Sequence, residues 1–301
     1  MFNTARKNWY ALLKHGLPNL SKRVKFLLKK EKNSLATTVP ASMDIPIWNN
    51  MKEKLTIIKV GGKIVEEPDS LKQLLNDFSQ VTGHKVLVHG GGRSATKLAS
   101  DLGIESKMVN GRRITDADML NVVTMVYGGL VNKKIVAGLQ SLNVNALGLT
   151  GADMNVIRSV KRPVKDVDYG FVGDVETVDG KLLSELIKKG IVPVMAPLTH
   201  DGKGNLLNTN ADTIAGETAQ SLAPYFDVTL IFCFEKKGVL KDADDENSMI
   251  PILTPEIFQQ CREDGTISGG MIPKLENSFA ALNAGVIKVI ITLATAIDGE
   301  S

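Results

Sequence analysis

Val86-Leu87-Val88-His89-Gly90-Gly91-Gly92-Arg93-Ser94-Ala95 is the stretch that decides the fold of this chain. It begins as a β-branched apolar run and passes through three glycines. It then continues into a stretch whose apolar residues recur every three or four positions, as in a helix. Glycines cost backbone entropy, so a chain keeps three of them where the backbone bends sharply or closely approaches a partner. Bare N–H groups at the start of a helix attract anions. We predict an anion site here; a plain strand-to-helix turn is the alternative.

Length and composition predict a globular chain with one large or two modest domains. The 301 residues, 43% of them hydrophobic, suffice to bury a substantial core. No uninterrupted apolar run approaches the roughly 20 residues of a membrane span, so no membrane partner is predicted. Cys233 and Cys261 follow no pattern, which favours two structural thiols and a reducing, cytoplasmic compartment. The four histidines form no cluster, and no metal site is predicted.

Positive charge is concentrated at the start of the chain. Residues 1–50 hold nine Lys or Arg and two Asp or Glu, whereas the remaining 251 hold 27 and 31. The body therefore gives no reason to expect nucleic acid as a partner. We expect 1–50 to be a basic leader that is disordered or extraneous, with Met51 as the working start. An amphipathic arm that helps the chain oligomerise and a targeting segment are the alternatives.

Beyond residue 54, strands and helices alternate. Apolar strands are expected at 55–60, 86–88, 191–196, 228–234 and 286–293, and helices at 69–81, 95–102, 115–142, 181–189, 211–222, 255–263 and 271–284. The apolar stripe of the long helix comprises Leu120, Val123, Val126, Leu130 and Val131. This alternation predicts an α/β fold, a three-layer αβα sandwich with a mostly parallel sheet, and ligands outside the carboxyl ends of its strands. Short alternating pieces within 156–180 predict β-hairpins.

Three glycine-rich turns, at 61–62, 90–92 and 269–270, are each expected to follow a strand. Lys59 precedes the first turn inside an apolar run, where a lysine needs a reason, and Lys274 follows the last turn. Several glycine cradles and two lysines favour a polyphosphate ligand. No Walker A motif or kinase catalytic loop occurs. The match to a dinucleotide fingerprint at 90–95 is weak, because the expected acid at the end of a second strand is missing.

Five motifs, taken in order, resemble those of the amino acid kinase family. They are Ile58-Lys59-Val60-Gly61-Gly62, His89-Gly90-Gly91-Gly92, Asn110-Gly111-Arg112-Arg113, Asn208-Thr209-Asn210-Ala211-Asp212 and Gly269-Gly270-Met271-Ile272-Pro273-Lys274. The resemblance covers about residues 54–295 and is strongest to members that phosphorylate N-acetylglutamate in arginine biosynthesis. It implies ATP and Mg²⁺, the ion bound mainly through the nucleotide phosphates, and a homodimer. It also implies a lobe 51–225 for the acylated amino acid and the dimer contact, hairpins over the substrate site, and a nucleotide lobe 226–301.

The resemblance also implies roles for single residues. Lys59 and Lys274 match the lysines that stabilise the phosphoryl group in flight, and Asp212 matches the aspartate that holds them. The substrate-binding positions are Gly91, Gly92, Arg113 and Asn208. The nucleotide-binding positions are Gly61, Gly62, Glu235, Lys237, Gly238, Ser268, Gly269 and Gly270. A γ-carboxylate has a reference pKa of about 4.3, so it is ionised at pH 7 and needs no general base. This chemistry requires cations and N–H groups rather than a catalytic histidine.

Several functions stay open at this stage. Acetyl is the expected acyl group, and succinyl is an alternative because the sequence singles out no residue that reads the acyl tail. Another member of the family, acting on carbamate, aspartate or a nucleotide, is a second alternative. A non-catalytic ligand sensor and a dinucleotide-dependent oxidoreductase are alternatives of different classes.

Overall fold

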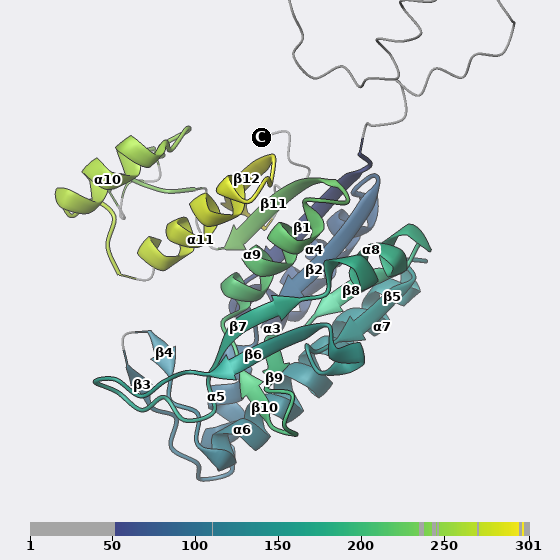
Figure 1. Ribbon diagram of the computed structural model, residues 1–301, viewed down its shortest axis with the longest axis vertical. Helices are drawn as coiled ribbons and strands as arrows, with labels where there is room; N and C mark the ends of the chain where they lie inside the picture. Colours follow the sequence, from purple (N-terminus) through teal and green to yellow (C-terminus); the bar gives the residue numbers. More distant parts are fainter. Residues whose placement is uncertain are drawn as a thin grey trace, which may run out of the picture. The chain divides into compact units, whose positions relative to one another are not determined.

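A six-stranded sheet forms the middle layer of the computed structural model (Figure 1), which describes residues 52–109, 111–234, 238–242, 245, 247–269, 271–294 and 297. The predicted leader 1–50 lies outside these residues. The strand order is β12-β11-β1-β2-β8-β5, and every pairing is parallel. The strands are β1 (Lys54–Val60), β2 (His84–His89), β5 (Ala146–Leu149), β8 (Val192–Met195), β11 (Asp227–Phe234) and β12 (Lys288–Leu293). The predicted parallel sheet is confirmed.

Helices cover both faces of this sheet, as predicted. They are α3 (Gly62–Glu66), α4 (Pro68–Gln80), α5 (Gly92–Asp101), α6 (Ala117–Val123), the π-helix η2 (Thr124–Val131), α7 (Asn132–Ser141), α8 (Gly180–Lys188), α9 (Ala211–Leu222) and α11 (Met271–Asn283). The helix α10 (Pro255–Glu263) lies away from the sheet (Figure 1) and packs against Val239, Ile267 and Leu275. Alternate residues of each strand enter opposite cores. Ile58 and Leu87 pack with α4 to α7, and Ile57 and Val86 pack with α8 and α9. Both cysteines are buried free thiols, as predicted.

The helix that begins at α6 is regular at its start and widened in its middle. The Asp116 carboxylate accepts a hydrogen bond from the Met119 N–H and so caps the start of the predicted helix. The π turns of η2 hold more residues than α turns do, so they rotate the apolar stripe. The predicted stripe is therefore wrong at Leu130, whose side chain is 48% exposed. Tyr127 is buried instead.

By length and composition, the continuous helix Ala117–Ser141 would be able to cross a membrane, and it alone among the described residues passes that test. Apolar runs in the sequence predict no membrane span, because small and polar residues within this helix interrupt every such run. Val122, Val126 and Ile135 lie fully buried in the core that also holds Ile58 and Leu87. Packing within the chain therefore accounts for the buried face of this helix, whereas Met125 and Leu130 stay exposed.

Shorter strands form two further sheets. β6 (Ile157–Lys161) pairs antiparallel with β7 (Gly173–Val178), which confirms the predicted hairpin. With β9 (Leu198–His200) and β10 (Leu206–Asn208), these strands form a sheet in the order β10-β9-β6-β7. β3 (Met108–Val109) and β4 (Arg112–Arg113) form a separate antiparallel pair.

The chain reverses direction across the sheet beside β1. It passes from β1 to β2 on one side and later returns to β11 on the other, so a crevice is expected at the carboxyl ends of these strands. Glycine turns 61–62 and 90–92 lie there, directly after β1 and β2. The third turn was predicted wrongly, since residues 266–268 form no strand and Gly269 follows a loop after α10. The sheet also runs across the predicted lobe boundary, because β11 pairs with β1.

Candidate active site

Two lysines from distant parts of the chain meet one aspartate. The Lys59 Nζ lies 2.8 Å from Oδ1 of Asp212, and the Lys274 Nζ lies 3.0 Å from Oδ2. Lys59 shares a face of β1 with Ile57, which directs its side chain toward α9. Asp212 stands in the first turn of α9, where the Asn210 side chain caps two N–H groups. The three charged side chains are 11%, 18% and 12% exposed for Lys59, Asp212 and Lys274.

The charges in this cluster shift one another's protonation. Burial alone would raise the pKa of the Asp212 carboxyl, but the two neighbouring ammonium groups outweigh burial and hold that pKa below its usual value. Burial and the charge of Lys59 lower the pKa of Lys274, although Asp212 opposes them. A pair of cations around one carboxylate favours the arrival of a further anion.

The first two glycine turns lie against each other. A Cβ atom at Gly90 would lie 3.3 Å from the Gly62 nitrogen, and one at Gly62 would lie 3.5 Å from the Gly92 nitrogen. A side chain at Gly90 would therefore crowd the contact between the turns, whereas one at Gly62 would lie at an ordinary contact distance. Among the described residues, no backbone acceptor meets the N–H of Gly62, Gly91 or Gly92. The turns thus present free donors at two helix N-termini, as an anion cradle requires.

Beside the cradle lies a cavity of about 230 Å³, and it gathers all four predicted substrate-binding residues. Gly91, Gly92, Arg113 and Asn208 line it. The Arg113 Nη2 donates hydrogen bonds to the Gly92 carbonyl and to the Thr96 hydroxyl, both at 2.9 Å, and Nη1 donates to the Ser106 hydroxyl. These contacts fix a buried guanidinium at the wall of the cavity.

Further side chains line this cavity although sequence reasoning did not select them as site residues, among them Tyr127, Arg162 and Asn210. Asn210 lies within the motif Asn208–Asp212, so that motif could have identified it as a site residue. Tyr127 belongs to the π turns of η2, which no 3.6-residue pattern reveals.

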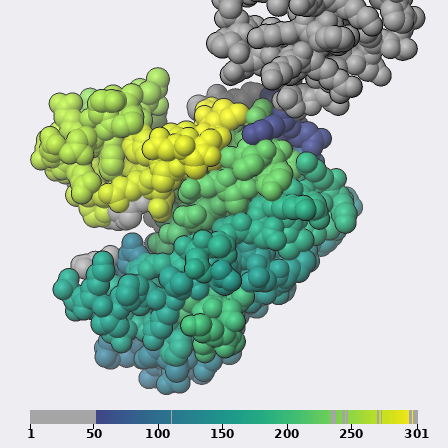
Figure 2. All heavy atoms as spheres, in the orientation of Figure 1, coloured from purple at the N-terminus to yellow at the C-terminus, as the bar shows by residue number. Residues whose placement is uncertain are grey.

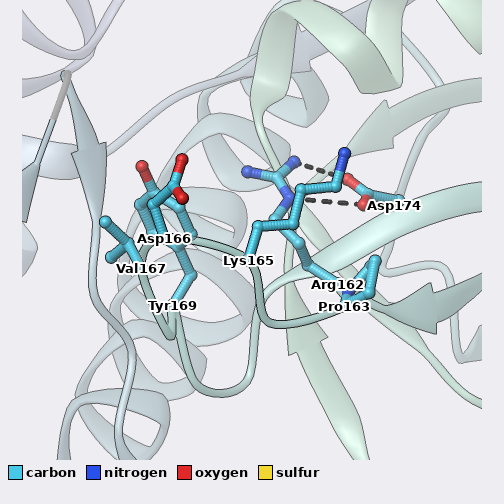
Figure 3. Close-up of a pocket in the computed structure, with 7 residues that line it drawn as sticks. All are labelled: Arg162, Pro163, Lys165, Asp166, Val167, Tyr169 and Asp174. Carbon is cyan, nitrogen blue, oxygen red and sulfur yellow. Dashed lines mark hydrogen bonds and ion pairs between the residues drawn. The ribbon is translucent and has the colours of Figure 1, made fainter.

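Arg162 also lines a second pocket of about 290 Å³ on the segment between β6 and β7 (Figure 3). The Arg162 guanidinium forms an ion pair with Asp174 and lies 5.5 Å from the centre of the Tyr169 ring. Arg162 is therefore held between the two pockets.

The predicted nucleotide side is described in part. Ser268 and Gly269 are exposed directly before α11, whereas Gly238 is buried against Met249. Glu235, Lys237 and Gly270 lie outside the described residues. Figure 2 shows the surface hollowed between the yellow-green region that carries α10 and the blue-green region below it. The described part of the chain holds no group of three or more His, Cys, Asp or Glu side chains arranged for a metal ion.

Comparison with known proteins gives one consistent result. A family model described as the amino acid kinase family matches residues 54–293. Acetylglutamate kinase from Bacteroides thetaiotaomicron is 76% identical, over 82% of this chain and 96% of that protein. The enzyme of that name from Phocaeicola vulgatus is 75% identical, over 83% of this chain and 98% of its own. The crystal structure of smu.665 from Streptococcus mutans superposes with a TM-score of 0.65 at 30% identity, covering 79% and 94% of the two chains.

Proposed function

The chain belongs to the amino acid kinase family, and we propose that it transfers the γ-phosphoryl group of ATP to the γ-carboxylate of N-acetyl-L-glutamate, in arginine biosynthesis. The observation that carries this proposal is the cluster of Lys59, Asp212 and Lys274, which lies at the carboxyl end of β1 and is close to the glycine cradle. The names of the relatives indicate which molecule accepts the phosphoryl group, namely acetylglutamate.

The reaction needs charge neutralisation more than proton transfer. Both the acceptor carboxylate and the nucleotide phosphates are anions at neutral pH, so the main barrier is to bring them together and to stabilise the charge of the transferring group. Lys59 and Lys274 supply two ammonium groups for this purpose. Asp212 keeps both groups charged and aimed, and the N–H groups of Gly62, Gly91 and Gly92 add neutral donors.

The nucleotide brings Mg²⁺ with it in this proposal. Mg²⁺ usually keeps several waters and binds through substrate phosphates with one or two carboxylates. The described residues include no cluster of three metal ligands, which is consistent with an ion that is held mainly by the phosphates. The ion would neutralise charge on the β- and γ-phosphate oxygens, while the exposed turn at Ser268 and Gly269 borders the nucleotide. Glu235, Lys237, Gly238 and Gly270 stay predicted nucleotide contacts.

Arg113 is the proposed partner of the substrate α-carboxylate, because its guanidinium holds a positive charge at the wall of the cavity and pairs with a carboxylate through charge-assisted hydrogen bonding. Asn208 lies on the same cavity wall, and its Nδ2 donates to the Thr115 hydroxyl at 3.0 Å. This contact leaves the amide oxygen of Asn208 available to the substrate amide.

N-succinyl-L-glutamate is a second candidate substrate, because Arg112 and Arg162 line the same cavity as Arg113. The succinyl group ends in a carboxylate that a further guanidinium would pair with. ADP release with Mg-ATP, measured separately with N-acetyl-L-glutamate, N-succinyl-L-glutamate and free L-glutamate, tests both candidates. We expect turnover with an N-acylated glutamate and little with free glutamate. Equal turnover with all three, or none with any in a protein that still binds ATP, would contradict the proposal.

A homodimer and a cytoplasmic location complete the proposal. Met125 and Leu130 are exposed on η2, and Leu147 is exposed on β5, which is the edge strand of the sheet. An apolar helix face and an open strand edge suit a second copy of the chain. Analytical ultracentrifugation should give a dimer mass for the wild-type protein and a monomer mass for Leu130→Glu. A wild-type monomer at all concentrations would contradict this assignment.

A further inference from the structure

Behind the glycine cradle lies a buried polar pair that the proposed reaction does not use. His89 is the last residue of β2 and Asn132 is the first residue of α7. Both residues are buried, with exposed fractions of 0% and 1%. The Asn132 Nδ2 lies 3.1 Å from Nε2 of His89. Buried polar side chains cost stability unless they are hydrogen-bonded, so a pair in this position calls for an explanation.

Two backbone carbonyls fix the direction of every hydrogen bond in the pair. The His89 Nδ1 lies 2.7 Å from the Gly90 carbonyl, and a carbonyl accepts only, so Nδ1 carries the proton. The Asn132 Nδ2 lies 2.9 Å from the Val194 carbonyl of β8, which identifies this atom as the amide nitrogen. Its second N–H therefore donates to the unprotonated Nε2. Burial lowers the pKa of His89 to about 4, which agrees with a neutral ring at pH 7.

The pair is retained at a cost to stability. The Asn132 Oδ1 is buried and meets no hydrogen-bond partner among the described residues. This oxygen faces β5, where a Cβ atom at Gly148 would lie 1.9 Å from it, so only glycine fits. Apolar side chains at both positions 89 and 132 would avoid the unmet oxygen without leaving another buried polar atom unpaired in its place. A costly group that persists beside an active site is typical of a functional requirement.

The Gly90 carbonyl controls the donor that follows it. In a trans peptide the C=O of one residue and the N–H of the next lie in one plane and point in opposite directions. His89 holds the Gly90 carbonyl on its own side, and the Gly90 N–H is bound to the Val60 carbonyl at 3.1 Å. The Gly91 N–H must then point away from His89. Its nitrogen lies 3.7 Å from the Cβ position of Gly62, on the cradle side.

We infer that Asn132 and His89 are positioning residues that aim the Gly91 N–H into the anion cradle. Asn132 fixes the tautomer and the orientation of the imidazole, and the imidazole fixes the peptide between Gly90 and Gly91. The inference rests on the proposed phosphoryl transfer, since it assigns this N–H to the transferring group. Loss of the arrangement should lower kcat more than it raises KM, because a preorganised donor acts mainly in the transition state.

Two substitutions of His89 separate positioning from packing. Asparagine carries its amide on Cγ, where histidine carries Nδ1, so His89→Asn keeps a donor for the Gly90 carbonyl and loses the contact with Asn132. Glutamine reaches the place of Nε2, so His89→Gln keeps the contact with Asn132 and loses the donor. Glutamine is also closer to histidine in volume. If His89 served packing alone, the His89→Gln variant would be both more active and more stable than the His89→Asn variant.

We expect the activity ranking to be reversed. His89→Gln should lower kcat about 10²-fold, as does loss of one preorganised donor, and His89→Asn less than about 10-fold. The melting temperature should be lower for His89→Asn, and KM for both substrates should change little in either variant. A kcat that follows the melting temperature across the two variants would overturn the inference.

A spectroscopic readout keeps the inference testable if both variants fold poorly, and it does not depend on catalysis. Nitrogen-15 NMR of histidine-labelled wild-type protein at pH 7 should show His89 as the neutral tautomer with its proton on Nδ1. The signal is assigned by removing the other histidines one at a time. A proton on Nε2, or a cationic ring, would overturn the inference. A wild-type protein without turnover would instead contradict the proposed function and leave the tautomer result standing.

Discussion

Replacing Lys59 or Lys274 by methionine should lower kcat about 10³-fold, in the range found when a charge or donor that stabilises a transferring group is removed. Each lysine provides an ammonium group that reaches the Asp212 carboxylate within 3.0 Å. Methionine keeps most of the side-chain volume and removes the charge. Steady-state kinetics at saturating Mg-ATP and N-acetyl-L-glutamate measure the effect.

The same two variants should keep their folding stability. Each substitution leaves Asp212 paired with the other lysine, so no buried charge is left without a counter-charge, and we expect the free energy of unfolding to change by less than about 1 kcal/mol. Lys181→Met, on the exposed surface of α8, is the matched control and should leave both quantities unchanged. If either site variant lost only about twofold in kcat, the cluster would not be the phosphoryl-transfer site.

Asp212→Asn should impair both catalysis and folding. The amide cannot neutralise the two ammonium groups, and leaving buried charges without their counter-charge costs about 3 kcal/mol. The kcat should fall about 10²-fold or more, since both lysines lose the group that aims them. Asp118→Asn is the matched control, because Asp118 also stands in the first turn of a helix and loses the same interaction with the helix dipole. Urea unfolding and steady-state kinetics measure the two effects.

The pH dependence of stability gives this prediction a defined direction. The pKa of Asp212 is held below its usual value in the folded chain. Its contribution is therefore fully present above the unfolded pKa of about 3.9 and is lost as pH falls through the folded pKa. The difference in unfolding free energy between wild type and Asp212→Asn should shrink in that acidic window. A difference that grows toward low pH would contradict the assigned charges.

Much of the architecture follows from local patterns in the sequence. The apolar run that contains Lys59 predicts β1, and the glycines after it predict a close backbone approach, which the contact between Gly62 and Gly90 provides. The antiparallel pairing of β6 with β7 likewise follows from short alternating segments. These features depend on a few neighbouring residues, and neighbouring residues are what a sequence displays.

The features that could not be predicted depend on distant contacts. The π turns of η2 rotate Leu130 outward and Tyr127 inward, and packing against other elements decides their position. His89 and Asn132 are 43 positions apart, and only the fold brings their side chains within hydrogen-bond distance. The meeting of Lys59 with Asp212 and Lys274 came from family resemblance, because spacing along the chain does not contain it.

Trapping the reaction product with hydroxylamine tests the central claim most directly. An acyl phosphate reacts with hydroxylamine to give a hydroxamate, whereas inorganic phosphate released by simple ATP hydrolysis does not. With Mg-ATP and the preferred N-acylated glutamate, we predict one γ-hydroxamate for each ADP formed, and neither product from the Lys274→Met variant above background. Release of ADP without hydroxamate would show hydrolysis in place of transfer and would contradict the assignment of this site to carboxylate phosphorylation.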